Sequence, residues 1–96
     1  MERNEIIKLY DIYHNLLTEK QRTYFEDYYF SDLSLAEIAE NYDVSRNAVH
    51  DQLKRCVNEL EDYENKLHLK EKFENISNLN LDEKQKNDIL DILWEE

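Results

Sequence analysis

The sequence has no glycine and no proline among its 96 residues. The glycine-rich loops that bind phosphates or dinucleotides are therefore excluded, because their backbones need glycine to approach the ligand. Charged residues make up 36% of the chain, and Glu, Lys and Leu, which favour helices, are abundant. These features predict an all-α protein, and the length is enough for one small domain with a modest core.

Cysteine is scarce as well, with Cys56 as its single occurrence. One cysteine cannot close an internal disulfide and suits a reducing compartment. On the inner side of a helix it is interpreted as a small core residue rather than as a reactive thiol. No apolar run approaches the length of a membrane span, and polar residues interrupt the N-terminal segment where a signal peptide needs an apolar stretch. We therefore expect a cytoplasmic protein without a membrane span.

Patterns typical of catalysis or metal binding are missing too. No Cys or His pair has metal-ligand spacing, and His50 and His68 are too far apart on one helix to bind an ion together. The serines lack the nucleophile-elbow pattern. A catalytic carboxylate pair would need a cleft and a raised pKa, so we interpret one acidic group as a solvated helix face: Glu59, Glu61, Asp62 and Glu64. We predict no metal, no cofactor and no enzymatic activity.

The clearest motif of the chain lies near its middle. Ser34 and Glu37 have the S-x-x-E spacing of a capping box and predict the start of a helix. Asn41 or Asp43 can adopt the left-handed conformation that a turn needs, and Ser45 can cap a second helix. Two short helices joined in this way form a helix-turn-helix, whose second helix enters the DNA major groove by its N-terminal residues.

The residue types in this motif predict which side of it is buried. Val49 and Leu53 are expected to face inward, and the small Ala39 stands where the two helices approach closely. Val44 is expected to plug the turn and to form a hydrophobic staple with Val49. The opposite side of the second helix is expected to be exposed, and it carries Arg46, Asn47, His50, Asp51 and Lys54.

Two further helices are predicted before the motif, over about residues 4–17 and 19–30. An apolar stripe at helical spacing marks the first, and the T-x-x-Q capping box of Thr18 and Gln21 opens the second. The second is rich in aromatic residues: Tyr24, Phe25, Tyr28, Tyr29 and Phe30. We favour core packing for them, since an aromatic stripe at helical spacing is usually core. A platform for stacking nucleic-acid bases is the alternative.

The second helix of the motif is predicted to continue to about Phe73, because no turn residues occur before residues 75–80. It carries an apolar seam at heptad spacing: Leu53, Cys56, Leu60, Tyr63 and Leu67. The seam needs cover from the last helix, which is capped near residues 80–83 and ends near Trp94, or from a second copy of the chain. We expect a homodimer whose interface contains Leu60, Tyr63, Leu67 and Trp94. The chain is divided into a helix-turn-helix domain, residues 1–74, and a linker with a C-terminal helix, residues 75–96.

The net charge of −11 is unusual for a nucleic-acid binder, because phosphate contacts supply most of the affinity for DNA. The charge is unevenly spread, however. Residues 1–33 carry seven acids and four bases, residues 34–55 four and three, and residues 56–96 twelve and five, which gives −3, −1 and −7. Arg46, Lys54 and Arg55 all lie in the second helix of the motif. We therefore expect a weak, salt-sensitive interaction with duplex DNA.

The chain resembles the YlxM-like helix-turn-helix proteins of bacteria over about residues 6–73. The resemblance rests on LLT-x-KQ, an aromatic run, D-x-SL-x-EIAE, VSR-x-AV-x-D and KR, followed by L-x-x-YE-x-KL from Leu60 to Leu67. It implies an all-helical fold whose helix-turn-helix has no wing. It also implies a link to the signal recognition particle pathway, proposed because the family's genes lie beside those of the particle's GTPase and its receptor.

More distantly, the same stretch is similar to the DNA-binding region four of sigma factors. That similarity implies a set of DNA-facing positions, namely Arg46, Asn47, His50 and Lys54. Asp51 departs from a basic surface at this face.

Two functions fit these residues. The first is a DNA-binding regulator in which Arg46 and Asn47 contact base edges while Lys54 and Arg55 contact phosphates. The second is an acidic adaptor without DNA binding, which docks on a basic component of the signal recognition particle machinery. The expected partners are duplex DNA, components of the particle and a second copy of the chain.

Overall fold

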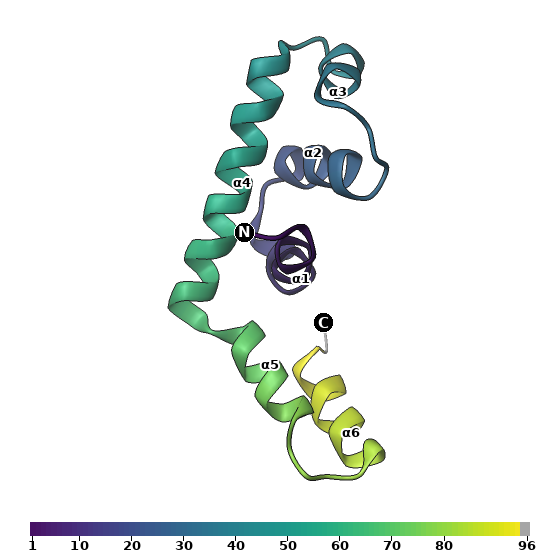
Figure 1. Cartoon of the computed structure of the whole chain (residues 1–96), viewed down its shortest axis with the longest axis vertical. Coiled ribbons are helices and arrows are strands. Elements are labelled where there is room, and N and C mark those ends of the chain that lie inside the picture. The colour runs from purple at the N-terminus through teal and green to yellow at the C-terminus, as the bar shows by residue number, and fades with distance from the viewer. Residues whose placement is uncertain (95–96) are drawn as a thin grey trace.

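The computed structural model describes residues 1–94, and within that range the chain is helical with no strand. In chain order the elements are α1 (Arg3–Tyr13), the 3₁₀ helix η1 (His14–Leu16), α2 (Glu19–Tyr29), α3 (Leu35–Asn41), α4 (Arg46–Leu67), α5 (Leu69–Ser77) and α6 (Glu83–Leu93). The predicted all-α class is confirmed. Figure 1 shows α1, α2 and α3 one above another along one side of α4, with α5 and α6 as a hairpin at its far end. The molecule is elongated, about 50 Å long and 24 Å across.

Two clusters of buried side chains join the first three helices to α4. One packs α1 and α2 against the middle of α4 and contains Ile6, Leu9, Tyr10, Tyr13, Leu17, Phe25, Cys56 and Leu60. The other packs α2 and α3 against the N-terminal half of α4 and contains Tyr24, Ile38, Ala39, Val49 and Leu53. Because α4 contributes to both clusters, its orientation relative to the other three helices is fixed by packing.

The aromatic residues of α2 divide between core and surface. Tyr24 and Phe25 are buried, and the Phe25 ring stacks on Tyr10 with centroids 4.1 Å apart, so core packing is confirmed for these two. Tyr28 and Tyr29 are half-buried, and Phe30 is 49% exposed. Adjacent residues on a helix point about 100° apart, so five aromatic residues within seven positions cannot all face one core.

Side chains at the helix N-termini fix where the helices begin. The Thr18 hydroxyl accepts the Gln21 N–H at 3.1 Å, and the Gln21 side chain accepts the Thr18 N–H at 2.9 Å. Ser34 and Glu37 exchange the same two bonds, both at 3.1 Å. Asp82 opens α6 with a third capping box. The predicted caps are confirmed, and each box satisfies two backbone N–H groups that a helix start would otherwise leave unpaired.

The prediction that α4 continues to about Phe73 was wrong, because the helix ends at Leu67. His68 takes the left-handed conformation, with φ of 55°, and α5 begins directly after it. The predicted linker is also displaced, since α5 continues to Ser77. The sequence has no glycine to mark this break, so a bulkier residue adopts the conformation that glycine adopts most easily.

The N-terminus of α5 is capped by two side chains, Glu64 from the last turns of α4 and Tyr13 from α1. The Glu64 carboxylate accepts the N–H groups of Lys70 and Glu71 at 3.0 and 3.2 Å. The Tyr13 hydroxyl donates to Glu64 at 2.6 Å and accepts the Leu69 N–H at 3.1 Å. These groups therefore satisfy the first N–H groups of α5, and we call them together the α4–α5 joint.

The α4–α5 joint also perturbs two titrating groups. Burial, together with the hydrogen bond to Glu64, raises the pKa of Tyr13 to about 12. Partial burial tends to raise the pKa of Glu64, but the hydrogen bonds from Tyr13 and from the Lys70 and Glu71 N–H groups outweigh it and lower that pKa below its usual range. At neutral pH the joint is therefore a neutral phenol bound to a carboxylate.

The α5–α6 hairpin has no fully buried side chain. Its two helices meet through Phe73 and Trp94, whose rings stack with centroids 4.8 Å apart. Lys70 connects the hairpin to α1 through an ion pair with Glu5 at 2.9 Å. The hairpin is therefore attached to the rest of the molecule through this ion pair, the α4–α5 joint and the partly buried Leu69, which packs against the first cluster.

Candidate nucleic-acid interface

The turn between α3 and α4 is closed by backbone hydrogen bonds in the pattern of a Schellman motif. The Val44 N–H donates to the Ala39 carbonyl at 3.0 Å, and the Asp43 N–H donates to the Glu40 carbonyl at 3.4 Å. Asp43 has a φ of 53°. Of the two predicted candidates, Asp43 makes the turn, and Asn41 is the last residue of α3. Asp tolerates this conformation better than most residues other than glycine.

The inner face of the motif is buried as predicted, with one exception. Val49 is fully buried, and Ala39 and Leu53 are nearly so. The prediction that Val44 plugs the turn was wrong, because its side chain is 36% exposed. The left-handed Asp43 redirects the backbone just before Val44, whose side chain lines a surface cleft with Tyr24 instead.

The exposed face of α4 begins at its N-terminus. The Ser45 hydroxyl caps the helix by accepting the Ala48 N–H at 3.0 Å, so Arg46 and Asn47 are its first two residues. Side chains in the first turn of such a helix can reach base edges in the major groove. The five predicted DNA-contacting residues are all exposed: Arg46, Asn47, His50, Lys54 and Arg55. Their predicted exposure is confirmed.

These residues do not form a single stripe around α4. At about 100° per residue, Asn47 and Lys54 project in nearly the same direction, with Asp51 between them. His50 and Arg55 lie on opposite flanks, because each lines a different cleft. The carboxylate of Asp51 is 3.7 Å from the His50 ring nitrogen. The most exposed face of α4, with Asn47, Asp51 and Lys54, is thus mixed in charge. The two flanks add further polar groups.

The cations of this face are unpaired within the described chain. Arg46, Lys54 and Arg55 have no carboxylate within 4.0 Å among residues 1–94. By contrast, Lys66 pairs with Asp62 at 2.8 Å further along the same helix. A cation without an internal partner can neutralise a phosphate without first breaking an ion pair. The N-terminal half of α4 therefore offers positive charge although the chain as a whole is acidic.

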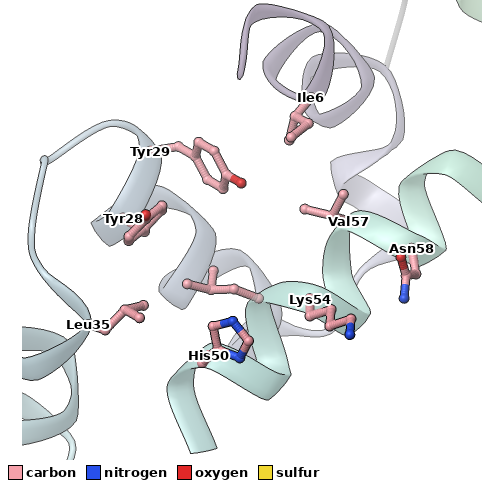
Figure 2. Close-up of a pocket in the computed structure, with 9 residues that line it drawn as sticks. Ile6, Tyr28, Tyr29, Leu35, His50, Lys54, Val57 and Asn58 are labelled. Atoms are coloured by element: carbon pink, nitrogen blue, oxygen red, sulfur yellow. The ribbon is translucent and has the colours of Figure 1, made fainter. Parts of the chain in front are cut away.

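A cleft that the sequence did not predict lies on the His50 flank of α4. Figure 2 shows Tyr28 and Tyr29 from α2 and Leu35 from α3 around it, with His50 and Lys54 on α4. Its volume is about 270 Å³. The lining residues are Ile6, Tyr28, Tyr29, Leu35, His50, Leu53, Lys54, Val57 and Asn58. We call it the α1–α4 cleft. The one signal for it in the sequence is the adjacent pair Tyr28 and Tyr29, which cannot both face the core.

A second cleft lies on the Arg55 flank and brings in a cation from α2. Lys20 lines it together with Arg55 and Asp51, and the Lys20 ammonium lies 5.7 Å from the centroid of the Tyr24 ring. Sequence analysis missed Lys20, because it lies in a capping box on another helix. It adds a positive group beside the predicted surface.

The four residues predicted to form an interface between two copies differ in how far they are buried. Leu60 is fully buried in the core against α1, so the structure contradicts its assignment to an interface between copies. Tyr63 is half-buried, and its hydroxyl donates to the Leu16 carbonyl at 3.4 Å. Leu67 and Trp94 are 45% and 44% exposed, and their contact with a second copy stays a prediction.

Metal centres and membrane-spanning helices are absent from residues 1–94. There, no group of three or more His, Cys, Asp and Glu side chains is placed to hold a metal ion. Across the same residues, no helix is both long enough and apolar enough to cross a membrane. Cys56 is fully buried, and burial, with a smaller contribution from the charge of Glu59, raises its pKa to about 12. It is a core residue, as predicted.

Comparison with known proteins identifies the family. Residues 1–93 match the model of the UPF0122 family, described as "Putative helix-turn-helix protein, YlxM / p13 like". The chain belongs to the UPF0122 family. The predicted relation to the YlxM-like proteins is thereby confirmed.

Individual UPF0122 proteins are similar over much of the chain. A UPF0122 protein of Shouchella clausii is 62% identical over 66 residues, which cover 69% of this chain and 61% of that protein. One of Staphylococcus haemolyticus is 52% identical over 80 residues, covering 77% and 73%. One of Bacillus cereus is 58% identical over 66 residues, covering 69% and 60%. The similar region thus spans about three fifths of the S. clausii and B. cereus proteins.

Proposed function

We propose that this chain binds duplex DNA through α3 and α4 and acts as a non-enzymatic regulator in the cytoplasm. The observation that carries the proposal is the set of exposed, internally unpaired cations on the N-terminal half of α4. In the proposed complex Arg46 and Asn47 contact base edges, and Lys54 and Arg55 contact phosphates. The family's description as helix-turn-helix proteins supports the proposal.

The two flanks of α4 fit the dimensions of the groove. An α-helix with its side chains is about 10–12 Å wide, and the major groove is about 12 Å wide. A helix that fills the groove therefore turns its flanks toward the two phosphate strands. His50 lies on one flank, and Arg55 and Lys20 lie on the other. Each strand then meets at least one group that can carry positive charge.

The proposal is tested by titrating fluorescent duplex DNA with the chain at several salt concentrations. We expect Arg46→Ala and Lys54→Ala each to weaken binding by about tenfold, because a lost base or phosphate contact costs about 1–3 kcal/mol. Lys54→Ala should also reduce the salt dependence by about one counterion. Lys72→Ala is the matched control, since it removes the same charge from an exposed site on α5. Negligible binding by the wild type and both α4 variants at low salt would rule the proposal out.

A second candidate is an acidic adaptor in the signal recognition particle machinery. The observation that favours it is the charge of −7 over residues 56–96, which suits a basic protein partner. We expect the chain to retain the particle's protein component in a pull-down at micromolar concentration. Absence of a complex under those conditions would count against this candidate without affecting the DNA proposal.

Self-association is the remaining partner that we propose. Of the residues first considered for it, Leu67 and Trp94 have the exposure that contact with a second copy needs. The α5–α6 hairpin, which has no fully buried side chain, supports an interface that includes α6. Sedimentation velocity at increasing concentration tests for association, and a strict monomer would refute it.

A further inference from the structure

The α1–α4 cleft combines an apolar floor with a rim that carries the ammonium group of Lys54. Ile6, Leu53 and Val57 contribute apolar surface, while His50 and Lys54 stand at its edge in Figure 2. None of its lining residues carries a carboxylate, whereas four other clefts in the described chain each include at least one. In a chain of net charge −11, such a cleft favours an apolar group flanked by negative charge.

The tyrosines of the cleft are poorly placed to stack on a flat ligand. The Tyr29 ring already stacks on Phe25, with centroids 4.3 Å apart, and the Arg3 guanidinium lies 5.2 Å from its centroid. Tyr28 meets Tyr29 edge-on, with an angle of 80° between the rings. The cleft volume of about 270 Å³ is also below the range of about 300–1,000 Å³ that is typical of small-molecule sites. An aliphatic side chain from a protein suits the cleft better than a nucleobase does.

Such a group is present on α6 of the same chain. Ile92 is 71% exposed, and at about 100° per residue it projects away from Leu90, which lines a cleft against Phe73 of α5. Asp88 lies one turn before Ile92 on the same face, and Asp91 directly precedes it. Asp88 is paired with Lys84 at 3.1 Å, whereas Asp91 has no cation within 4.0 Å among residues 1–94. The outward side of α6 is thus an apolar side chain beside the carboxylate of Asp91.

We propose that α6 of a second copy of this chain docks in the α1–α4 cleft, with Ile92 on its apolar floor and Asp91 toward Lys54 and His50. Every copy carries both the cleft and the helix. The α6 of each copy can therefore dock in the cleft of the other, which gives a closed two-fold dimer. This contact does not depend on DNA binding. It covers two of the residues proposed to face DNA, so dimer and duplex exclude each other.

Sedimentation velocity of the full chain at increasing concentration tests the docking. We expect the wild type to associate and Ile92→Asp to lower its association constant at least tenfold, because the substitution places a charge on an apolar floor. Leu16→Asp is the matched control, since Leu16 is 52% exposed and lies in η1, outside both surfaces. Circular dichroism confirms that each variant is folded. A monomeric wild type, or an Ile92→Asp variant that associates like the wild type, would overturn the proposal.

A charge exchange tests which surfaces meet. Lys54→Glu and Asp91→Lys should each weaken association when studied alone, because each places like charges opposite one another. An equimolar mixture of the two variants should associate again. In the mixed dimer, one contact pairs the introduced glutamate with the introduced lysine, and the other pairs the unchanged Lys54 with the unchanged Asp91. A mixture that stays as weak as either variant would contradict the pairing. A second result would also contradict the pairing. If Leu67→Asp abolished association and Ile92→Asp did not, the contact between copies would lie at Leu67 and not in the α1–α4 cleft.

The docking and the DNA proposal can fail separately. Arg46→Ala should lose DNA affinity and keep its association, because Arg46 does not line the cleft. Ile92→Asp should not lose DNA affinity, and at concentrations at which the wild type is dimeric it should bind DNA more tightly, because the competing contact is removed. If both proposals hold, duplex DNA added to the wild type shifts the sedimentation pattern from dimer toward a DNA-bound monomer. A DNA-bound dimer whose association still depends on Ile92 would disprove the mutual exclusion.

Discussion

Residues 3–67 bury thirteen apolar side chains, whereas α5 and α6 bury none. Both parts consist of capped, amphipathic helices, and the difference lies in what covers their apolar sides. From α1 to α4 most of the apolar side chains meet one another in the two core clusters. In the hairpin, Ile92, Leu93 and Trp94 stay substantially exposed at one end. The first part is therefore stabilised by its own core, and the hairpin depends on the α4–α5 joint and on any partner that covers it.

The largest expected effect is a contrast along α4, between a leucine in the core of the first part and one at the end that adjoins the hairpin. Leu60→Ala is expected to cost about 3 kcal/mol of unfolding free energy, because it opens a cavity in the core. Leu67→Ala, seven residues later and 45% exposed, should cost less than about 0.5 kcal/mol. Urea denaturation measures both. Equal costs would mean that the core extends to the hairpin or that it ends before Leu60.

Removing a hydrogen-bonding group from the α4–α5 joint should have the next largest effect on the free energy of unfolding. Tyr13→Phe removes the hydroxyl that binds Glu64 and the Leu69 N–H, and it should cost about 1–2 kcal/mol, as expected for a partly buried hydrogen-bonded group. Hydrogen exchange should accelerate at the first amides of α5. Tyr63→Phe is the control, because its hydroxyl makes one long, exposed bond. Unchanged exchange in α5 after Tyr13→Phe would show that the joint does not depend on this hydroxyl.

Acid should weaken the joint before it unfolds the core. The folded pKa of Glu64 lies below its usual value of 4.5, so the carboxylate stabilises the fold fully above about pH 4.5. That contribution is lost as pH falls through the lowered folded pKa. The protection factors of the Lys70 and Glu71 amides, which take account of the slower intrinsic exchange in acid, should therefore fall in this window. Glu64→Gln should remove this acid dependence, and a variant that retains it would assign the effect to another carboxylate.

The smallest expected effect is a gain. His68 and Asp43 both have left-handed φ values, 55° and 53°, which cost a residue with a Cβ about 1–2 kcal/mol. Glycine removes that cost but adds about 0.4–1 kcal/mol of unfolded-state entropy. His68→Gly should therefore stabilise the chain by about 0.5 kcal/mol. Asp43→Gly should gain less, because Asp tolerates the conformation better. Thermal denaturation compares them, and destabilisation by His68→Gly would mean that the imidazole supports the joint.

Local sequence patterns predicted the helix starts well. The boxes at Thr18 and Ser34 and the caps at Ser45 and Asp82 depend on residues within three positions of one another. The exposure of Arg46, Asn47 and Lys54 followed from helical spacing once those starts were known. The helix-turn-helix and its outward side could thus be predicted without knowledge of tertiary contacts.

Apart from Val44, whose exposure is a local effect of the left-handed Asp43, the errors arose where distant residues decide the structure. The end of α4 depends on Tyr13, which is 51 positions from its partner Glu64, and no local pattern reports that contact. Leu60 has the spacing of a coiled-coil seam, but α1 of the same chain covers it. The α1–α4 cleft was missed for the same reason, because four helices contribute to it. Heptad spacing identifies an apolar side and does not say which element covers it.

The 22 residues of α4 make a rod of about 33 Å with the proposed DNA surface at one end and the hairpin at the other. Packing against three other helices fixes its orientation, so α1 to α4 move as one rigid body. A slight tilt of this body on a bound duplex therefore displaces its distal end by several ångströms. A fluorophore on the hairpin would therefore report events at the opposite end without touching them.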